Sequence, residues 1–524
     1  MKTNLYRWLT CLIVWSLLVN ASNAFAQTVA VTQKTSLETQ INSILDQSKF
    51  APAHWGVRII TFDNRVVYER NADKLFMPAS NMKLYTTAAT LDAFGPAKTF
   101  RTSVYSTVKN DGGTVKGDVI LYGRGDTALS ALFDLNSEGK PNPVDHYLPA
   151  DKIAPIEKLA DQIQTSGIKN INGDLIGDDS YFVTNGLGAG WEWDDLMFYY
   201  GAPISALTVN DNVVTFTVRP AMKAGAPPMI QMQPQNSYVR IINNATTGNG
   251  KDGKTHIGAN RNLNSNEVEF FGNIPSGAKD FSVDISVHDP AGLATNLLKE
   301  ALQRRGIKIK GTVKRMTAFN RVANTFDTTK LNEIAFIESQ PMSVLLKAIN
   351  KPSQNLHTEM MLRQIGENVG VRELDDYGRP KTSDSRGIEA LRQFLIKAGV
   401  DVTSLSLRDG SGLARQNLIS PRSTSQLLLY MSKHPHFEIF RDSLPVAGDG
   451  TLNRRMKGTA AEGKVQAKTG SLSFVRALSG YVTTKKNQTL IFSFFGNNYT
   501  GVGGDVTGVF DQLCILLAEF EAEL

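Results

Sequence analysis

The seven residues Met-Pro-Ala-Ser-Asn-Met-Lys, at positions 77–83, decide the fold class of this chain of 524 residues. Apolar residues at helical spacing follow as far as Phe94, and Gly95 then ends the pattern, because glycine readily adopts the left-handed conformation after a helix. Ser80 and Lys83 therefore lie three positions apart at the start of a predicted helix. Side chains at that spacing share one face, so the hydroxyl and the amine come within reach of each other.

The start of a helix suits a nucleophilic hydroxyl, because the unpaired N–H groups and the positive end of the helix dipole favour developing negative charge. A lysine beside it acts as a base only when burial or a nearby cation lowers its pKa. Ser106 and Lys109 repeat the Ser-x-x-Lys pattern, but the alternating residues 102–108 predict a strand. On a strand, positions i and i+3 point to opposite faces. We therefore take Ser80 as the candidate.

A second short pattern, Ser353-Gln354-Asn355, precedes a predicted helix over residues 356–365. A hydroxyl in this position relays protons, and an amide holds a substrate carbonyl; the Ser-x-Asn pattern accompanies Ser-x-x-Lys in penicillin-binding enzymes. Taken alone, the pattern is more typical of an ordinary helix cap.

A third pattern, Lys468-Thr469-Gly470, ends a predicted strand that begins at Lys464. A cation and a hydroxyl at a strand end suit a substrate carboxylate, and a glycine lets a peptide approach the strand closely. Alone, this pattern is also typical of a turn. The three patterns occur in one order, on a helix start, a loop and a strand end, and that combination is specific.

Elements at both ends of the chain predict one antiparallel sheet flanked by helices, an α+β fold. Turn residues 63–65 between two β-rich runs predict a hairpin. The expected elements are a helix over 36–50, strands over 56–62, 66–69, 464–469, 477–483 and 489–495, and a final helix over 506–520.

Between residues 100 and 311 the pattern changes to short alternating strands separated by Gly, Asn and Pro, with one helix over 291–305. Residues 243–266 are rich in Gly, Asn and Lys and predict a loop. We interpret this region as two mainly β domains inserted between the first and second patterns. The expected division is a signal peptide over 1–26, a catalytic domain over 27–100 and 332–524, one inserted domain over 101–208 and 283–331, and another over 209–282.

The first 26 residues predict a cleaved signal peptide. Lys2 and Arg7 precede an apolar run over 9–19 that is too short to span a membrane comfortably, and Ala24 and Ala26 are the small residues that a signal peptidase reads. An uncleaved anchor helix is the alternative. We therefore expect a chain exported to the periplasm.

Composition excludes several classes of function. The net charge is +6 without a run of Lys or Arg, which argues against nucleic-acid binding. The seven histidines show no recognisable metal-ligand spacing, so we expect no metal and no cofactor. Loss of Cys11 with the signal peptide leaves Cys514 alone, in an apolar helical run that predicts a buried thiol.

Taken together, these patterns resemble the class C penicillin-binding proteins, the D-alanyl-D-alanine carboxypeptidases and endopeptidases of peptidase family S13. The resemblance extends to a segment Asp-Gly-Ser-Gly-Leu-Ala-Arg at 409–415, with Ala414 where the family has serine, and to residues 123–126 and 172–174 in the insert. The long interval between Ser80 and Ser353, which holds the insert, is also similar and differs from the smaller serine β-lactamases.

The resemblance implies roles for individual residues. Ser80 would be the acylated nucleophile and Lys83 its general base, while Ser353 and Asn355 would transfer protons and position substrate. Lys468 and Thr469 would bind the terminal carboxylate of the substrate, next to Gly470. Backbone N–H groups of Ser80 and Ser471 would form the oxyanion hole.

The family also places Trp, Asp and Tyr from the insert beside the groove, and the segment 191–199 matches at Trp191, Asp194 and Tyr199. Asp194 and Arg415 would then recognise the zwitterionic end of a diaminopimelate side chain. An aromatic packing cluster with a surface acid is the alternative interpretation, and Asp195 is an alternative acid.

We therefore expect a serine D,D-carboxypeptidase and D,D-endopeptidase that acts on peptidoglycan stem peptides and is inhibited by β-lactams. We also expect peripheral association with the wall or the membrane surface. A β-lactamase-like hydrolase and a non-catalytic wall-binding homologue are the rival hypotheses. The sequence does not predict an oligomeric state.

Overall fold

The computed structural model describes residues 36–127, 129, 153–248, 253–321, 327–501 and 503–521, and the chain divides into two compact units, Met1–Ser48 and Lys49–Leu524. In the first unit, helix α2 spans Leu37–Leu45, and Ser36 Oγ caps it by accepting from Thr39 N. The expected signal peptide, 1–26, lies outside the described residues. In the part of the chain that the structure describes, no helix is long and apolar enough to cross a membrane.

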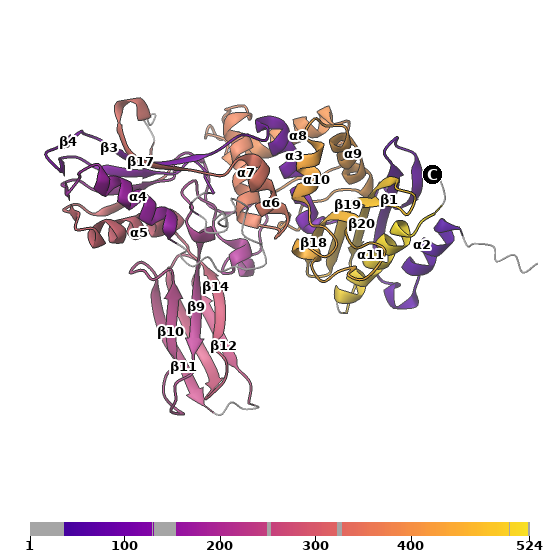
Figure 1. Cartoon of the computed structure of the whole chain (residues 1–524), viewed down its shortest axis with the longest axis horizontal. Coiled ribbons are helices and arrows are strands. Elements are labelled where there is room, and N and C mark those ends of the chain that lie inside the picture. Colours follow the sequence, from indigo (N-terminus) through magenta and orange to yellow (C-terminus); the bar gives the residue numbers. More distant parts are fainter. Residues whose placement is uncertain are drawn as a thin grey trace, which may run out of the picture. The chain divides into compact units, whose positions relative to one another are not determined.

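The second unit contains a five-stranded antiparallel sheet in the order β18-β19-β20-β1-β2 (Figure 1). The strands span His54–Thr61 (β1), Val66–Arg70 (β2), Val465–Leu472 (β18), Val475–Thr483 (β19) and Thr489–Asn497 (β20). This arrangement confirms the predicted hairpin and the three closing strands. Because β1 pairs with β20, the sheet joins the two ends of the chain, and β18 forms one of its edges.

Helices cover both faces of this sheet. Neighbouring residues of a strand point to opposite faces, and in β20 Phe495 stacks on Phe76 whereas Phe494 packs against Phe510 of the last helix. The helices of this part span Met82–Phe94 (α3), Met342–Asn350 (α6), Asn355–Asn368 (α7), Ser383–Lys397 (α8), Pro421–Ser432 (α9), Phe437–Ser443 (α10) and Gly503–Ala518 (α11). Cys514 of α11 is buried, as predicted, and burial raises the pKa of its thiol.

Helix α3, which follows the first pattern, lies inside the helical layer. Every residue from Met82 to Leu91 is buried, and Gly95 ends the helix with φ +72°. A helix that is buried on all sides has a fixed position and rotation. The core thereby fixes Lys83 on its first turn.

After α3 the chain leaves the part of the molecule that contains this sheet, and it returns to that part at α6. A second five-stranded sheet has the order β16-β8-β6-β3-β17, and a smaller one the order β15-β7-β5-β4. Their elements span Arg101–Ser106 (β3), Asn110–Asp111 (β4), Thr114–Val115 (β5), Val119–Tyr122 (β6), Ala154–Thr165 (α4), Asn170–Ile171 (β7), Leu175–Asp178 (β8), Pro290–Arg304 (α5), Lys308–Ile309 (β15), Val313–Met316 (β16) and Asn332–Glu338 (β17).

Two three-stranded sheets, β10-β9-β14 and β11-β13-β12, complete the insert. Their strands span Val213–Arg219 (β9), Met229–Gln233 (β10), Arg240–Gly248 (β11), His256–Arg261 (β12), Glu267–Pro275 (β13) and Phe281–Ser286 (β14). The prediction of a loop over 243–266 was therefore wrong. Long parts of it pair with β13, because hydrogen bonds between strands hold a polar, partly exposed sequence in a small sheet.

One expected boundary also needs correction. We assigned residues from 332 onward to the catalytic domain, but β17 pairs with β3 in the sheet of the insert. Ile337 and Ala335 of β17 belong to the core that this sheet shares with α4 and α5.

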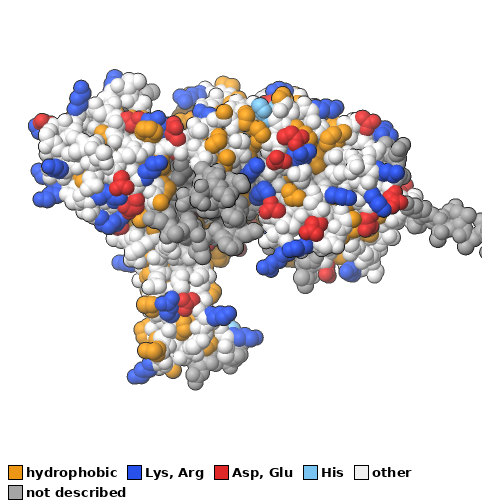
Figure 2. Space-filling model, in the orientation of Figure 1, with side chains coloured by type: hydrophobic (Ala, Val, Ile, Leu, Met, Phe, Trp, Pro, Cys, Tyr) orange, Lys and Arg blue, Asp and Glu red, His pale blue; other side chains and the backbone are white. Residues whose placement is uncertain are grey.

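The surface in Figure 2 carries acidic and basic side chains interspersed, without a continuous region of one charge on the face shown.

Candidate functional site

Ser80 lies in a short 3-10 helix, η2 (Ala79–Asn81), that leads directly into α3. Ala79 is fully buried, and its φ is +47°. This left-handed backbone conformation costs energy for a residue with a side chain. Asn81 fixes the turn from the other side, because its Nδ2 donates to Ser479 Oγ of β19 at 2.8 Å. The backbone at Ser80 is therefore held by the sheet as well as by the helix.

Lys83 lies directly behind Ser80. Its Nζ is 3.0 Å from Ser80 Oγ, 2.6 Å from Asn355 Oδ1 and 2.8 Å from Ser411 O. The side chain is completely buried, and burial lowers the pKa of its amine to about 7, although the charges of Asp409 and Glu359 act in the opposite direction. Near neutral pH this amine is therefore available to accept the proton of Ser80.

Lys468 on β18 forms a second pair of amine and hydroxyl. Its Nζ donates to Ser353 Oγ at 2.9 Å and to Thr469 O at 3.1 Å. Burial, and after it the charge of Lys83, lower its pKa well below the usual lysine value. Ser353 has φ +67°, a strained backbone conformation in a loop. The backbone of an ordinary helix-capping residue would instead be extended. The three patterns thus meet at one site.

A buried carboxylate that the sequence analysis missed supports Lys83. Glu359 lies one turn after Asn355 on α7, and its Oε1 accepts from the N–H groups of Gly410 and Ser411 at 2.9 and 2.8 Å. These bonds hold the carbonyl of Ser411 against Lys83. In the sequence, an acid directly before the apolar residues Met360, Met361 and Leu362 was the available signal.

Gly470 is required by a close approach within the chain itself. A Cβ at this position would lie 2.6 Å from the carbonyl oxygen of Pro78 and 3.2 Å from Asn81 N. The glycine lets β18 pack against the turn that carries Ser80, and this contact brings the first and third patterns together. The close approach of a peptide, which the sequence analysis expects at Gly470, stays a prediction.

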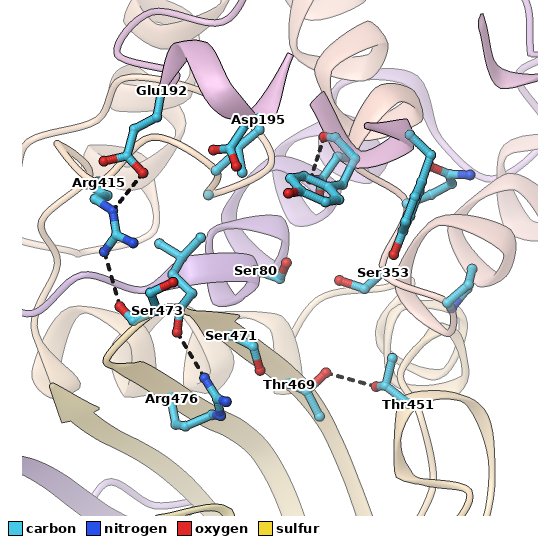
Figure 3. A pocket seen from close by; sticks show the side chains of 18 of the residues that line it. Ser80, Glu192, Asp195, Ser353, Arg415, Thr451, Thr469, Ser471, Ser473 and Arg476 are labelled. Carbon is cyan, nitrogen blue, oxygen red and sulfur yellow. Dashed lines mark hydrogen bonds and ion pairs between the residues drawn. The ribbon is translucent and has the colours of Figure 1, made fainter. Parts of the chain in front are cut away.

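These groups open into a cavity of about 820 Å³ (Figure 3). In the figure, Thr451 and Thr469 lie at one end, Glu192 and Arg415 lie at the other, and Ser80 and Ser353 lie between them. The lining residues come from the insert, the loops around α7 and the edge strand β18; they are Ser80, Glu192, Asp194, Asp195, Tyr199, Tyr200, Pro352, Ser353, Gln354, Asn355, Gly412, Leu413, Arg415, Thr451, Arg455, Thr469, Ser471, Leu472, Ser473, Arg476 and Thr507.

The expected site residues divide into three groups. Ser80, Ser353, Asn355, Thr469, Ser471, Asp194, Tyr199 and Arg415 line the cavity, whereas Lys83 and Lys468 lie buried behind their serines. Trp191 is not among the lining residues: its Nε1 donates to Asp409 Oδ2 at 3.0 Å, which ties the insert to the loop beside Lys83.

Arg415 has a partner that the sequence analysis did not consider. Its Nε donates to Glu192 Oε2 at 3.0 Å and its Nη1 to Ser473 O at 3.1 Å. The alternative acid, Asp195, is partly buried and bonds to Tyr200; burial raises its pKa. This end of the cavity therefore presents acids and a guanidinium side by side, which suits a ligand group with charges of both signs.

The other end carries a second cation that the sequence analysis did not single out. Arg455 donates to Asp511 Oδ1 from Nε at 2.9 Å and from Nη2 at 2.7 Å. Thr469 Oγ1 donates to Thr451 Oγ1 at 2.8 Å. Because Asp511 already pairs with the guanidinium of Arg455, the hydroxyls at this end are the groups that suit an anionic ligand.

In the described ranges, no group of three or more His, Cys, Asp or Glu side chains could hold a metal ion. His357, which follows the second pattern, is a buried residue of α7, and its Nε2 lies 2.8 Å from Asp211 Oδ1.

The rate at which Ser80 reacts with a substrate or inhibitor is expected to rise with pH through about 7. The neutral amine of Lys83 is the form that accepts a proton, and its pKa is lowered to about 7 by burial. Stopped-flow measurement of acylation between pH 5 and 9 checks this expectation. A rate that stays constant to pH 9, or that rises only near the ordinary lysine pKa, would contradict it.

A family model described as "D-Ala-D-Ala carboxypeptidase 3 (S13) family" matches residues 37–513. A "D-alanyl-D-alanine carboxypeptidase" of Actinomadura sp. (strain R39) is 32% identical over 518 residues, which cover 96% of this chain and 88% of that protein. "D-alanyl-D-alanine carboxypeptidase DacB" of Haemophilus influenzae is 25% identical, over 83% of this chain and 84% of the relative.

Among solved structures, penicillin binding protein 4 from Haemophilus influenzae superposes with a TM-score of 0.75 at 23% identity, covering 92% of this chain and 99% of that one. A second structure of that protein, complexed with a β-lactam, has a TM-score of 0.70 at 22% identity, with the same coverage. These likenesses agree with the α+β fold and the antiparallel sheet flanked by helices.

Proposed function

Because the chain belongs to the D-Ala-D-Ala carboxypeptidase 3 (S13) family of serine-type carboxypeptidases, we propose that it cleaves D-alanyl bonds of peptidoglycan stem peptides through an acyl-enzyme on Ser80. Its substrates are the D-Ala-D-Ala terminus and the crosslink from D-Ala to diaminopimelate. The observation that carries this proposal is the hydroxyl of Ser80, 3.0 Å from a fully buried lysine amine whose pKa is lowered to about 7.

In the first half of the reaction, Lys83 takes the proton of Ser80 as Oγ attacks the carbonyl carbon of the D-Ala residue. The N–H groups of Ser80 and Ser471 stabilise the oxyanion that forms, and one such donor is typically worth about 3 kcal/mol of barrier. Ser353, whose hydroxyl bonds to Lys468 Nζ, passes a proton to the leaving amine. Asn355, which accepts from Lys83 and donates to Tyr200 O, holds the substrate amide.

The terminal carboxylate of the substrate binds at the end of the cavity that holds Thr469 and Ser471. Lys468 lies directly behind this position, and the N–H groups of its amine and the strand-end hydroxyls are hydrogen-bond donors that favour an anion. In the second half of the reaction, water attacks the acyl carbon and gives a proton to Ser353, which replaces the proton that Ser353 lost to the leaving amine. Lys83 returns its proton to Ser80 Oγ as the acyl bond breaks, so that the enzyme is regenerated without a cofactor.

The acidic and basic side chains at the opposite end bind the side chain of the residue that precedes the acyl D-Ala. We propose that Arg415 takes the carboxylate of a diaminopimelate side chain and that Asp194, with Glu192 nearby, takes its ammonium group. Trp191 and Tyr199 belong to the same segment: Trp191 positions it through Asp409, and Tyr199 lines the cavity.

Replacing Arg415 by alanine is expected to raise KM for a peptide with diaminopimelate at its third position by about tenfold or more, because a charge-assisted hydrogen bond to a carboxylate is worth roughly 1.5–3 kcal/mol. A peptide with lysine in that position has no such carboxylate, so its KM should change much less. Steady-state kinetics of D-alanine release from both peptides check the difference. An equal effect on both would assign Arg415 to holding the loop at Ser473.

The same chemistry supports β-lactams as inhibitors that acylate Ser80. We also propose export to the periplasm through the signal peptide at 1–26, association with the wall, and the division into a catalytic part and two inserted domains. The likeness to a protein solved with a β-lactam supports the first of these proposals.

The proposed function is tested by incubating the purified protein with penicillin and, separately, with a stem pentapeptide. We expect a long-lived adduct of one penicillin per chain, mapped to the peptide with Ser80, and release of free D-alanine from the pentapeptide. Rapid turnover of penicillin without an adduct would instead indicate a β-lactamase-like hydrolase. No reaction with either compound would indicate a non-catalytic wall-binding protein.

A further inference from the structure

Three aromatic side chains are exposed in the lining of the cavity or next to residues that line it. Trp193 is 76% exposed, Phe474 is 58% exposed and Tyr199 is 49% exposed. Trp193 stands between Glu192 and Asp194, which both line the cavity, and Phe474 follows Ser473, which also lines it. Exposed apolar side chains that gather beside a pocket are typical of a binding site.

Arg415 connects the two segments that carry these rings. It bonds to Glu192 on the insert and to the carbonyl of Ser473 in the turn between β18 and β19. Figure 3 shows Glu192, Arg415 and Ser473 together at one end of the cavity, away from Thr451. Trp193 and Phe474 are the next residues after the two partners of Arg415, so both rings belong to this end.

Phe474 stands at a position that is unfavourable for an aromatic residue. It lies in the two-residue turn Ser473-Phe474 with φ +64°, where the left-handed conformation favours glycine or asparagine. A strained turn with a solvent-exposed phenylalanine gains nothing from core packing. The observation therefore points to a role for the ring outside the fold.

The proposed function gives the direction in which a substrate leaves the cavity. A peptide binds along the exposed edge of β18, with its terminal carboxylate near Thr469 and its preceding residues toward Ser473. Each extended residue covers at most about 3.3–3.6 Å. The few residues that separate the scissile bond from the sugar therefore carry the glycan to the region of Phe474 and Trp193.

We propose that Trp193, Phe474 and Tyr199 form an aromatic rim that binds the glycan strand to which the stem peptide is attached. The inference rests on the proposed function and extends it to the polymeric part of the substrate. Sugar rings present apolar C–H faces that stack on aromatic rings, and their hydroxyls require polar partners. The rings stand beside the polar end of the cavity, and apolar faces in polar surroundings suit a carbohydrate better than a purely apolar partner.

The test compares a free stem pentapeptide with the same peptide attached to a short glycan chain. The variants are Trp193→Ala and Phe474→Asn, and asparagine is chosen because it tolerates positive φ, so that the turn is kept. Tyr377→Ala is the matched control, since Tyr377 is 83% exposed and is not among the described residues that line the cavity. We expect kcat/KM for the glycan-linked peptide to fall about tenfold in the double variant, and kcat/KM for the free peptide to stay within about twofold.

A second readout does not depend on catalysis. Binding of peptide-free glycan chains, measured by calorimetry, should weaken in the rim variants and not in Tyr377→Ala. If no D-alanine is released from either peptide, the proposed function fails, while glycan binding still reports on the rim. An equal loss of activity on both peptides, or unchanged glycan binding in the double variant, would overturn the proposal. Loss of binding to anionic lipid vesicles with unchanged glycan binding would also overturn it, in favour of a membrane contact.

Discussion

Replacing Ser80 by alanine is expected to abolish the covalent adduct with penicillin and to lower kcat/KM for a D-Ala-D-Ala peptide by about 10⁴-fold or more, the scale seen when a catalytic nucleophile is removed. Without Oγ, the amine of Lys83 has no hydroxyl proton to accept, and only substrate binding and oxyanion stabilisation contribute to the rate. Intact-mass spectrometry after incubation with penicillin and a D-alanine release assay measure the two effects.

The chain offers a matched control for this variant. Ser106 also begins a Ser-x-x-Lys pattern, but it lies on β3 in the insert, and its Oγ is buried without a hydrogen-bond partner among the described residues. Ser106→Ala should therefore keep both the adduct and the activity. Persistence of the adduct in Ser80→Ala, or its loss in Ser106→Ala, would refute the assignment of the nucleophile.

Replacing Glu359 by alanine is expected to destabilise the protein by about 3–5 kcal/mol, because it removes the nearest carboxylate from the buried charge of Arg363 and leaves Asp384 at 4.0 Å. Glu359 and Arg363 are both fully buried on α7, with Nη1 and Oε2 3.0 Å apart. Burial raises the pKa of Glu359, which shows how strongly its charge depends on these surroundings. Denaturant unfolding, followed by fluorescence, measures the change in the free energy of unfolding.

Two further variants separate charge from hydrogen bonding. Glu359→Gln keeps an oxygen that accepts from Gly410 and Ser411 N–H groups, so it should lose less stability than the alanine variant and retain part of the penicillin reactivity. Glu389→Ala removes an exposed acid from the neighbouring helix α8 and should be nearly neutral. If Glu359→Ala unfolds at the same denaturant concentration as the unmodified protein, the pair does not stabilise the fold.

The sequence predicts well those parts of the structure that depend on local patterns. The helix from 82 to 94 and its end at Gly95, the first hairpin and the three closing strands follow from hydrophobic periodicity and turn residues. The sequence also predicts the α+β class, because the predicted helices and antiparallel strands lie at both ends of the chain. Strands β11 and β12 escaped prediction because pairing with β13, and not their own composition, makes them strands.

The site shows the same division. The three patterns bring out Ser80, Lys83, Ser353, Asn355 and Lys468, since their chemistry is evident from residue type and spacing. Glu359 and Glu192 act through contacts with residues far along the chain, which spacing does not reveal. The sequence analysis singled out Gly470 for the approach of a peptide. Its close neighbour within the chain, the carbonyl of Pro78, is visible only in three dimensions.

The pairing of β1 with β20 has a consequence for the order in which the protein folds. The sheet that holds the Ser80 turn needs strands from both ends of the chain, so it has contacts of very long range and forms slowly. The insert is complete at β17, long before β18 to β20 are synthesised, and domains generally fold as units from the N-terminus. A growing chain is therefore expected to mature in two stages, in which the insert becomes ordered first and reactivity toward penicillin appears only after the last strand has closed the sheet.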